Sequence, residues 1–297
     1  MVELSDWNCC GGASAATLSE DAQEALGRRN LERVRNVAPE LLCPCPHCYT
    51  SFARTLAAAG EAGAESPVVR LRSILDVFAS EEVLARLLSR RVEPLTDLPM
   101  VGYYGCKLLR PDPEAIRLGS TPSPDDGGSG GGPIERVIEA CGAKPVEWSA
   151  GGDCCGSALG VARVEVAEEL LGRIYQAALD AGAEAIVTVC PLCHLNLDLH
   201  QYQVSQRLGR SVDIPVFFLT ELMAVALGVE ESEDWLERHV TSPLPMFMRF
   251  IEAEEERQYW GPGGPPGESV DEKAPPAGPT AEEVGTGAPQ GDQHSRP

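Results

Sequence analysis

The chain has 297 residues, 43% of them hydrophobic, and its 45 acidic against 24 basic side chains give a formal net charge of −21. This length suffices for two domains, each with its own core. The excess of negative charge would repel phosphates, which argues against a nucleic-acid partner. No basic region followed by an apolar core opens the chain, and the most apolar stretch, IPVFFLTELMAVALGV, is too short and too interrupted to span a bilayer. We therefore expect a soluble, cytoplasmic protein.

Eleven cysteines are the most informative feature of the composition. In a reducing compartment, clustered cysteines are metal ligands or redox groups more often than parts of a disulfide framework. Ten of the eleven lie in compact groups. Cys141 lies apart from them, within IEACGAKPVEW, and we expect it to be a buried core thiol.

The chain repeats itself at a distance of 145 residues. Cys9, Cys10, Cys45 and Cys48 align in this way with Cys154, Cys155, Cys190 and Cys193. The segment LGR at 26–28 recurs at 171–173, and a further shift of three residues aligns 67–78 with 215–226. The coincidence of four cysteines with these flanks indicates a tandem duplication.

Both units predict the same order of elements. In the second unit, apolar residues at helical spacing predict a helix over 161–182, and the apolar run at 183–189 predicts a buried strand. Cys-x-x-Cys then opens a helix over 191–209, and a strand at 214–219 and a helix at 220–228 follow. This alternation favours an α/β fold with a parallel sheet, whose ligands lie beyond the carboxyl ends of the strands.

The second unit has an opening that the first lacks. A strand in MVGYYGCKLLRP leads to Cys106, a polar loop follows at 120–133, and PIERVIEACGAKPVEW predicts a helix and a strand before the Cys154–Cys155 doublet. The position 145 residues before Cys106 precedes Met1. We expect that the chain begins late rather than that the unit is naturally short, because a sheet without its first strand would expose an unpaired edge.

These boundaries divide the chain into four parts. We expect a first unit over 1–92, a second and complete unit over 98–229, a helical extension over 230–260 and an acidic tail over 261–297. The tail is rich in Gly and Pro and has almost no large apolar residues. It cannot bury enough surface to offset its ordering entropy, so we predict that it is disordered.

The second unit offers five thiols, from Cys106, Cys154, Cys155, Cys190 and Cys193. A structural zinc site needs four ligands, so one thiol would be left over. A thioredoxin-like dithiol needs a single Cys-x-x-Cys and leaves the doublet unexplained. An iron–sulfur cluster needs several thiolates from separate segments, and adjacent cysteines suit its different iron atoms. The iron–sulfur interpretation fits best, with zinc and dithiol chemistry as alternatives.

The order C…CCG…CxxC in the second unit resembles the cysteine-rich CCG domain, and two such domains in tandem resemble the B subunit of heterodisulfide reductase. The resemblance covers about residues 5–228 and implies two Rossmann-like modules. It also implies that each complete module holds a noncubane [4Fe–4S] cluster on five thiolates. In that protein, two clusters that face each other split a disulfide substrate between them. Related pairs of domains occur in the iron–sulfur subunits of glycolate, lactate and glycerol-3-phosphate oxidising enzymes, and in one class of succinate dehydrogenase.

The resemblance assigns ligands residue by residue. In the second module these are Cys106, Cys154, Cys155, Cys190 and Cys193; in the first they are Cys9, Cys10, Cys45 and Cys48, without the fifth. Cys154, Cys155 and Cys193 are also the residues that we expect to act in catalysis. Cys43 has Thr188 at the matching place of the second unit, and it is a candidate for the missing ligand.

Four other side chains are weaker candidates. His47 and His194 lie inside or beside the Cys-x-x-Cys pairs and could donate protons. Lys107 and Arg110 could balance cluster charge or orient an anionic substrate. Ordinary hydrogen bonding and surface roles are the alternatives for all four.

Three functions from different classes follow. The first is a disulfide-reducing iron–sulfur subunit that accepts electrons from a partner ferredoxin-like or flavoprotein subunit. The second is an electron-transfer subunit of a respiratory dehydrogenase of the succinate, glycolate/lactate or glycerol-3-phosphate type, without a substrate of its own. The third is a zinc-stabilised interaction protein.

Overall fold

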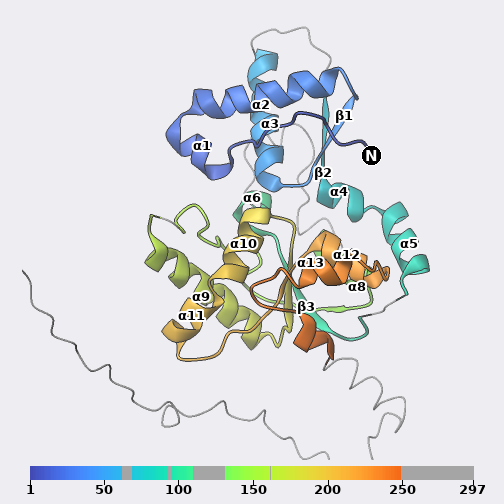
Figure 1. The fold of residues 1–297 in the computed structure, drawn as a ribbon, viewed down its shortest axis with the longest axis vertical. Helices are drawn as coiled ribbons and strands as arrows, with labels where there is room; N and C mark the ends of the chain where they lie inside the picture. Colours follow the sequence, from blue (N-terminus) through green and yellow to red (C-terminus); the bar gives the residue numbers. More distant parts are fainter. Residues whose placement is uncertain (62–68, 93–94, 110–130, 161, 249–297) are drawn as a thin grey trace, which may run out of the picture. The chain divides into compact units, whose positions relative to one another are not determined.

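A computed structural model describes residues 1–61, 69–92, 95–109, 131–160 and 162–248 (Figure 1). Residues 1–250 cluster as one unit and residues 251–297 as another, so the fold below is that of the first. The predicted tail at 261–297 and the later part of the predicted helical extension lie outside the described residues, as does most of the polar loop at 120–133.

The first ninety residues combine helices with two parallel strands. In chain order the elements are α1 (Gly12–Leu18), α2 (Glu20–Arg35), β1 (Glu40–Cys43), α3 (Pro46–Glu61), β2 (Arg70–Ser73), α4 (Ile74–Phe78) and α5 (Glu81–Arg90). The start of α2 follows from its sequence, since the Ser19 hydroxyl accepts a hydrogen bond from the backbone N–H of Ala22. Two acidic side chains, Glu20 and Asp21, occupy the first turn, where the helix dipole favours negative charge.

A parallel sheet in the order β4-β3-β5-β6 organises the described part of the second half. The elements there are β3 (Pro99–Tyr103), α6 (Gly105–Leu109), α8 (Pro133–Ala140), β4 (Lys144–Pro145), α9 (Val164–Asp180), β5 (Ala185–Thr188), α10 (Pro191–Leu199), α11 (Gln201–Leu208), β6 (Val216–Phe218), α12 (Leu219–Ala226) and α13 (Ser232–Leu236). Every strand pair of this sheet is parallel. The predicted α/β fold with short parallel sheets is confirmed.

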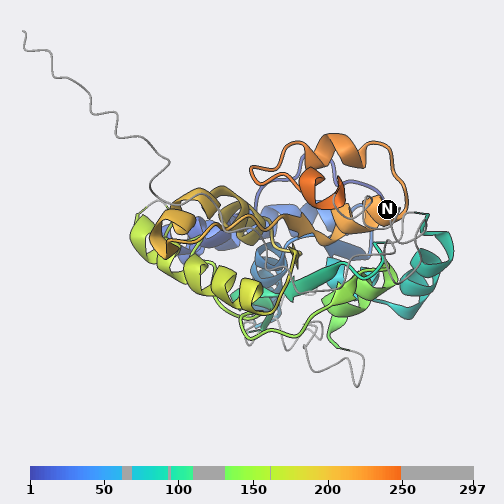
Figure 2. The same cartoon turned by 90° about the horizontal axis from the view of Figure 1, so that it is seen from below.

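Alternate residues of the strands face two different hydrophobic clusters. Met100 and Val187 contribute to a cluster with α8, α12, α4 and α5, whereas Val101 and Ile186 contribute to a cluster with α9, α10 and α11. Figure 2 shows α9 and α8 on opposite sides of β3, the teal arrow. Helices therefore cover both faces of the sheet, as the near-continuous apolar strands require.

The repeat keeps a constant spacing of 145 residues through its last strand. Leu41 pairs with Leu71 in the first unit, and Ile186 pairs with Val216 in the second. The predicted three-residue shift between 67–78 and 215–226 is therefore wrong. Short strands with similar apolar residues can be aligned in more than one way from sequence alone. The hydrogen bonds between paired strands select a single register. By this spacing β1 and β2 correspond to β5 and β6, and no strand in the described part of the first unit corresponds to β3 or β4.

The single helix predicted over 191–209 is two helices. His200, with φ −99° and ψ 8°, separates α10 from α11. Gln201 stabilises the break, because its amide group donates to the carbonyls of Leu197 and Ile214 and accepts from the N–H of Ile214. These bonds to a distant loop make the interruption favourable, and local helix propensity does not record them.

Candidate metal centre

The ends of parallel strands bring cysteines to one edge of each sheet. β5 ends two residues before Cys190, which is the N-cap of α10. β1 ends two residues before Cys45 in the same way, and α3 begins next. β3 leads into α6, which carries Cys106. The carboxyl ends of parallel strands share one edge, so these thiols converge where the fold places ligands.

Both cysteine doublets have the same local geometry. Gly156 follows the second doublet with φ +75°, and its backbone N–H donates to the Cys154 sulfur at 3.4 Å. Gly11 follows the first doublet with φ +84°, and its N–H donates to the Cys9 sulfur at 3.3 Å. The left-handed conformation is open to glycine without penalty, which explains the sequence CCG at both places.

The five predicted ligands of the second unit lie together, and each sulfur contacts another. The Cys155 and Cys193 sulfurs lie 3.4 Å apart. Cys193 also contacts Cys190, and Cys106 contacts Cys154, the other member of the doublet, within hydrogen-bonding reach. The five thiols therefore form one group, which we call the second thiol group.

The predicted ligands of the first unit form an equivalent first thiol group. The Cys10 and Cys48 sulfurs lie 3.2 Å apart, matching the pair at 155 and 193. Cys48 also contacts Cys45, and Cys10 contacts Cys9.

The two thiol groups come close to each other at one place. The Cys190 thiol lowers the pKa of Cys45, so these two side chains are near enough to interact. They are equivalent in the repeat, so the interaction joins matching members of the two groups. α3, which begins beside Cys45, also packs against α6, which carries Cys106. Sulfur contacts and the two doublets thus connect all nine cysteines across the two units.

Hydrogen bonds between thiols favour thiolates at chosen positions. A bond from Cys193 lowers the pKa of Cys155 to about 7, and a bond from Cys48 lowers the pKa of Cys10 to about 7. The thiol of Cys190 lowers the pKa of Cys45 further still. The same bonds raise the pKa of the partner thiols Cys48 and Cys193, so one thiol of each pair, and not the whole group, is favoured as the thiolate that a metal needs.

The backbone beside the second thiol group leaves room that a side chain would fill. Gly105 has φ +66°, and a Cβ atom there would lie 3.2 Å from the Cys193 sulfur. The Tyr103 hydroxyl donates to the Asp153 carbonyl at 2.6 Å, which fixes the loop before the doublet. The thiols, the close backbone and the N–H bonds to sulfur fit an iron–sulfur cluster.

Asn196 is a positioning residue that the sequence did not reveal. Its side-chain amide donates to the Cys155 carbonyl at 2.6 Å, in a buried environment. It lies one turn after Cys193 on α10, so the same helix supplies a thiol and holds the doublet in place. The position of Asn196 three residues after Cys193 on a predicted helix was the sequence signal that could have identified it.

The remaining cysteines lie in hydrophobic surroundings. Cys141 is fully buried in the cluster between the sheet, α8 and α12, as predicted. Cys43 is buried in the core of the first unit, and burial raises the pKa of its thiol well above the ordinary value. The thiol of Cys43 points to the Leu41 carbonyl at 3.9 Å.

Two of the weaker candidates, His47 and Lys107, lie near the place where the two thiol groups approach each other. Burial lowers the pKa of His47, while the nearby charges of Cys45 and Lys107 act on it in opposite directions. Lys107 also lowers the pKa of Cys106. His194 is nearly buried and stacks on Phe218. Arg110 lies outside the described residues.

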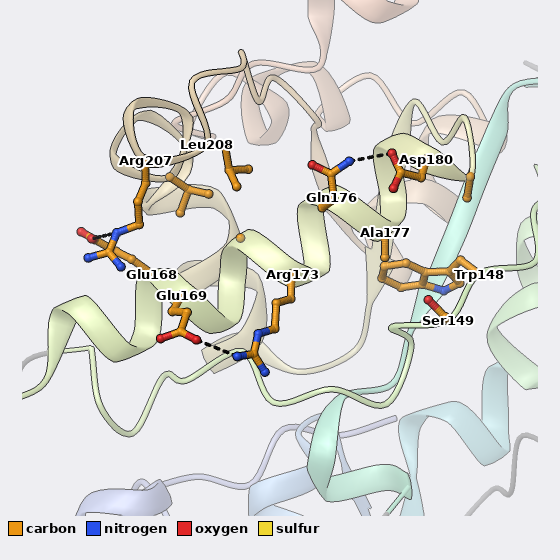
Figure 3. A pocket seen from close by; sticks show the side chains of 13 residues that line it. Trp148, Ser149, Glu168, Glu169, Arg173, Gln176, Ala177, Asp180, Arg207 and Leu208 are labelled. Atoms are coloured by element: carbon orange, nitrogen blue, oxygen red, sulfur yellow. Dashed lines mark hydrogen bonds and ion pairs between the residues drawn. The ribbon is translucent and has the colours of Figure 1, made fainter.

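A groove of about 670 Å³ lies between α9 and α11, away from the thiols (Figure 3). Its charged side chains are paired with one another, as in Arg207 with Glu168 and Arg173 with Glu169. Among the described residues that line it there is no cysteine. The thiol groups, and not this groove, therefore hold the reactive side chains.

Known proteins resemble the chain over most of its length. The B subunit of the ferredoxin/F(420)H(2)-dependent CoB-CoM heterodisulfide reductase of Methanosarcina acetivorans is 28% identical over 84% of this chain and 87% of its own. The B subunit of the ferredoxin:CoB-CoM heterodisulfide reductase of Methanosarcina mazei is 28% identical over 77% and 79%. The 8-methylmenaquinol:fumarate reductase membrane anchor subunit of Wolinella succinogenes is 26% identical over 81% and 86%.

The fold also has a solved counterpart. A hypothetical protein from Helicobacter pylori superposes with a TM-score of 0.57 at 10% identity, over 80% of this chain and 45% of that chain. Within the described residues, no helix has the length and apolar character needed to cross a membrane. The family model for the cysteine-rich domain CCG matches residues 1–53 and 101–198, which hold both thiol groups. Its oxidoreductase relatives and its clustered cysteines support iron–sulfur redox chemistry. The chain therefore belongs to the family of cysteine-rich CCG domain proteins.

Proposed function

We propose that this protein is an iron–sulfur oxidoreductase subunit of the heterodisulfide reductase B type, which receives electrons from a partner subunit and reduces a disulfide. The Methanosarcina relatives support this role, since they bear that name and match the chain over most of their length. The partner would be a ferredoxin-like iron–sulfur subunit or a flavoprotein subunit.

The two thiol groups would hold the clusters. Cys106, Cys154, Cys155, Cys190 and Cys193 would bind a noncubane [4Fe–4S] cluster, and Cys9, Cys10, Cys45 and Cys48 would bind another in the first unit. A bound cluster supplies one-electron redox chemistry at potentials that its surroundings tune. Because cleavage of a disulfide takes two electrons, this chemistry suits a protein that receives electrons one at a time. Cys154, Cys155 and Cys193 are the residues that we place nearest the reaction.

The proximity of the two thiol groups carries the proposal: α3, which begins beside Cys45, packs against α6, which carries Cys106, and the Cys190 thiol acts on Cys45. A disulfide has two sulfur atoms, and two facing thiol groups offer one binding partner to each of them. Lys107 and His47 adjoin this junction, because both the Cys45 and the Lys107 charges act on His47. In a chain with a net charge of −21, a cation at this place would favour an anionic disulfide.

A second candidate function is supported by the fumarate reductase relative. In this role the protein would pass electrons within a respiratory dehydrogenase and would have no substrate of its own. The same cluster ligands would serve, so the two functions differ in whether a thiol or disulfide reaches the junction.

Anaerobic purification followed by a thiol titration tests both candidates. We expect about four iron and four sulfide for each loaded cluster, and a new paramagnetic signal when the oxidised protein meets its thiol. A loaded protein that gives no new signal with any thiol or disulfide would favour the electron-transfer role. A colourless protein with zinc and no acid-labile sulfide would contradict both.

A matched pair of variants tests the ligand assignment. Cys155→Ala should lower the iron content by about four per chain, because the thiolate beside Cys193 is lost. Cys141→Ala removes a buried thiol of the hydrophobic core and should leave the iron content unchanged. Equal iron in both variants would contradict the assignment.

A further inference from the structure

Three side chains outside the thiol groups converge on one point. His194 lies on α10, Glu221 lies in the first turn of α12, and His239 follows α13. One ligand atom of each lies within 4.8 Å of the other two. The side chains are 12%, 15% and 3% exposed, so the group is largely shielded from solvent. We call it the His–Glu–His group.

Its spacing approaches that of metal ligands. The Nε2 atom of His239 lies 3.4 Å from Oε1 of Glu221, and Nε2 of His194 lies 3.9 Å from Oε2. Ligand atoms at about 2.1 Å from a tetrahedral zinc lie roughly 3.4 Å apart, so a small contraction would complete the geometry. Nε2 of His194, the ring nitrogen on the side of Glu221, is buried and has no hydrogen-bond partner in the part of the chain that the structure describes. Such an orphan nitrogen is costly unless a ligand satisfies it.

Neighbouring contacts hold the three side chains in place. The His194 ring stacks on Phe218 at 4.1 Å between centroids. The Asp198 carboxylate accepts hydrogen bonds from the N–H groups of Val240 and Thr241, at 2.7 and 2.9 Å. These bonds fix the segment directly after His239 against α10. Preorganised side chains of this kind are typical of metal sites.

The repeat shows that helix capping alone does not explain the group. Glu221 accepts from the N–H of Phe218 at 2.8 Å, and Asp76, 145 residues earlier, accepts from the N–H of Ser73 at 3.1 Å. An aspartate therefore suffices for this cap. The longer glutamate leaves Oε1 free to approach His239. Tyr49 stands in the first unit where the second has His194.

We propose that His194, Glu221 and His239 bind a divalent transition metal ion, with zinc as the ion that two imidazoles and one carboxylate suit best. Water would take the fourth position. The site has no sulfur ligand and shares no residue with either thiol group. A test of this site therefore does not depend on the disulfide chemistry. Bound metal would tie the segment after α13 to α10 and α12.

Zinc analysis of the full-length protein with its iron in place tests the proposal. We expect wild type to hold about one zinc per chain more than His239→Ala and Glu221→Gln, with equal iron in all three. Asp76→Asn controls for loss of a carboxylate charge at a helix cap, and His200→Ala controls for loss of a buried histidine nitrogen without a partner among the described residues. Both controls should keep the zinc of wild type.

The Glu221→Asp variant keeps the test decisive if His239→Ala fails to fold. Aspartate retains the cap, as Asp76 does, but withdraws the oxygen that faces His239. We expect at least tenfold weaker zinc binding by equilibrium dialysis, with an unchanged melting temperature in the absence of zinc. The same zinc content in wild type and all variants would overturn the proposal. Zinc and iron falling together in His239→Ala would also overturn it, since the histidine would then act on the thiol groups.

Discussion

At Gly105 the absence of a side chain lets the backbone come close to the sulfur of Cys193, a proposed cluster ligand. The residue has φ +66°, which L residues rarely adopt, and a Cβ atom would lie 3.2 Å from the Cys193 sulfur. Gly182 has a similar φ of +70°, but a Cβ atom there would meet no described atom within 4 Å. The two glycines share a backbone constraint and differ in what surrounds them.

We predict that Gly105→Ala lowers iron and sulfide content, whereas Gly182→Ala does not. Each substitution should destabilise the protein by about 1–2 kcal/mol, because both place alanine in the left-handed region. Only the first places a Cβ atom against the sulfur of Cys193, which we propose as a cluster ligand. Iron and acid-labile sulfide assays, with urea midpoints for both variants, check this. Equal iron content in the two variants would show that the contact with Cys193 is unimportant.

The same helix pair packs differently in the two units. Gly27 on α2 and Gly172 on α9 are equivalent in the repeat. A Cβ atom on Gly27 would meet the Thr55 hydroxyl of α3 at 2.3 Å. A Cβ atom on Gly172 would meet Leu208 and Val204 of α11 at 3.7 and 3.8 Å, which is ordinary contact. α2 therefore approaches its neighbour more closely than α9 does.

We predict opposite stability changes at these two glycines. Gly172→Ala should raise stability by about 0.5–1 kcal/mol, since alanine loses less backbone entropy in a helix. Gly27→Ala should lower it, because overpacking costs about 1–3 kcal/mol and exceeds the propensity gain of at most ~1 kcal/mol. Urea denaturation midpoints measure both. Shifts of the same sign would refute the packing difference.

Element types and their order could largely be predicted, whereas their ends and partners could not. The buried strand at 185–188 and the helix at 164–180 follow from apolar periodicity. The break at His200 depends on bonds from Gln201 to Ile214, thirteen residues away. The register of β2 and β6 depends on their pairing with β1 and β5. Alignment of the two repeats by residue type alone therefore shifted β2 relative to β6 by three residues.

At the scale of the whole molecule, the contact of Cys45 with Cys190 joins the two thiol groups. Each of these residues also contacts the second cysteine of its own Cys-x-x-Cys. A disulfide across the units would therefore compete with one inside each motif. Removing Cys48 and Cys193 eliminates that competition.

We predict that the metal-free Cys48→Ser/Cys193→Ser protein forms a Cys45–Cys190 disulfide on treatment with diamide. The two thiols lose two electrons and two protons to the oxidant, and their contact makes this pair the favoured one. Peptide mapping without reductant should find the bridge, and added Cys190→Ser should abolish it. Cys141→Ala in the same background is the control and should retain it. A bridge from Cys45 to any other cysteine would contradict the contact between the units.

The sequence by itself determined which cysteines fall into the two groups, the doubled CCG and Cys-x-x-Cys pattern and the alternation of strands and helices. These features are local, because spacing along the chain dictates them directly. Only the tertiary structure decided that the two thiol groups meet at Cys45 and Cys190, that Asn196 holds the Cys155 carbonyl, and that His239 reaches Glu221. Each of these contacts joins residues far apart or on different elements. Their energies depend on packing and strand register, which a repeat or a periodicity does not record.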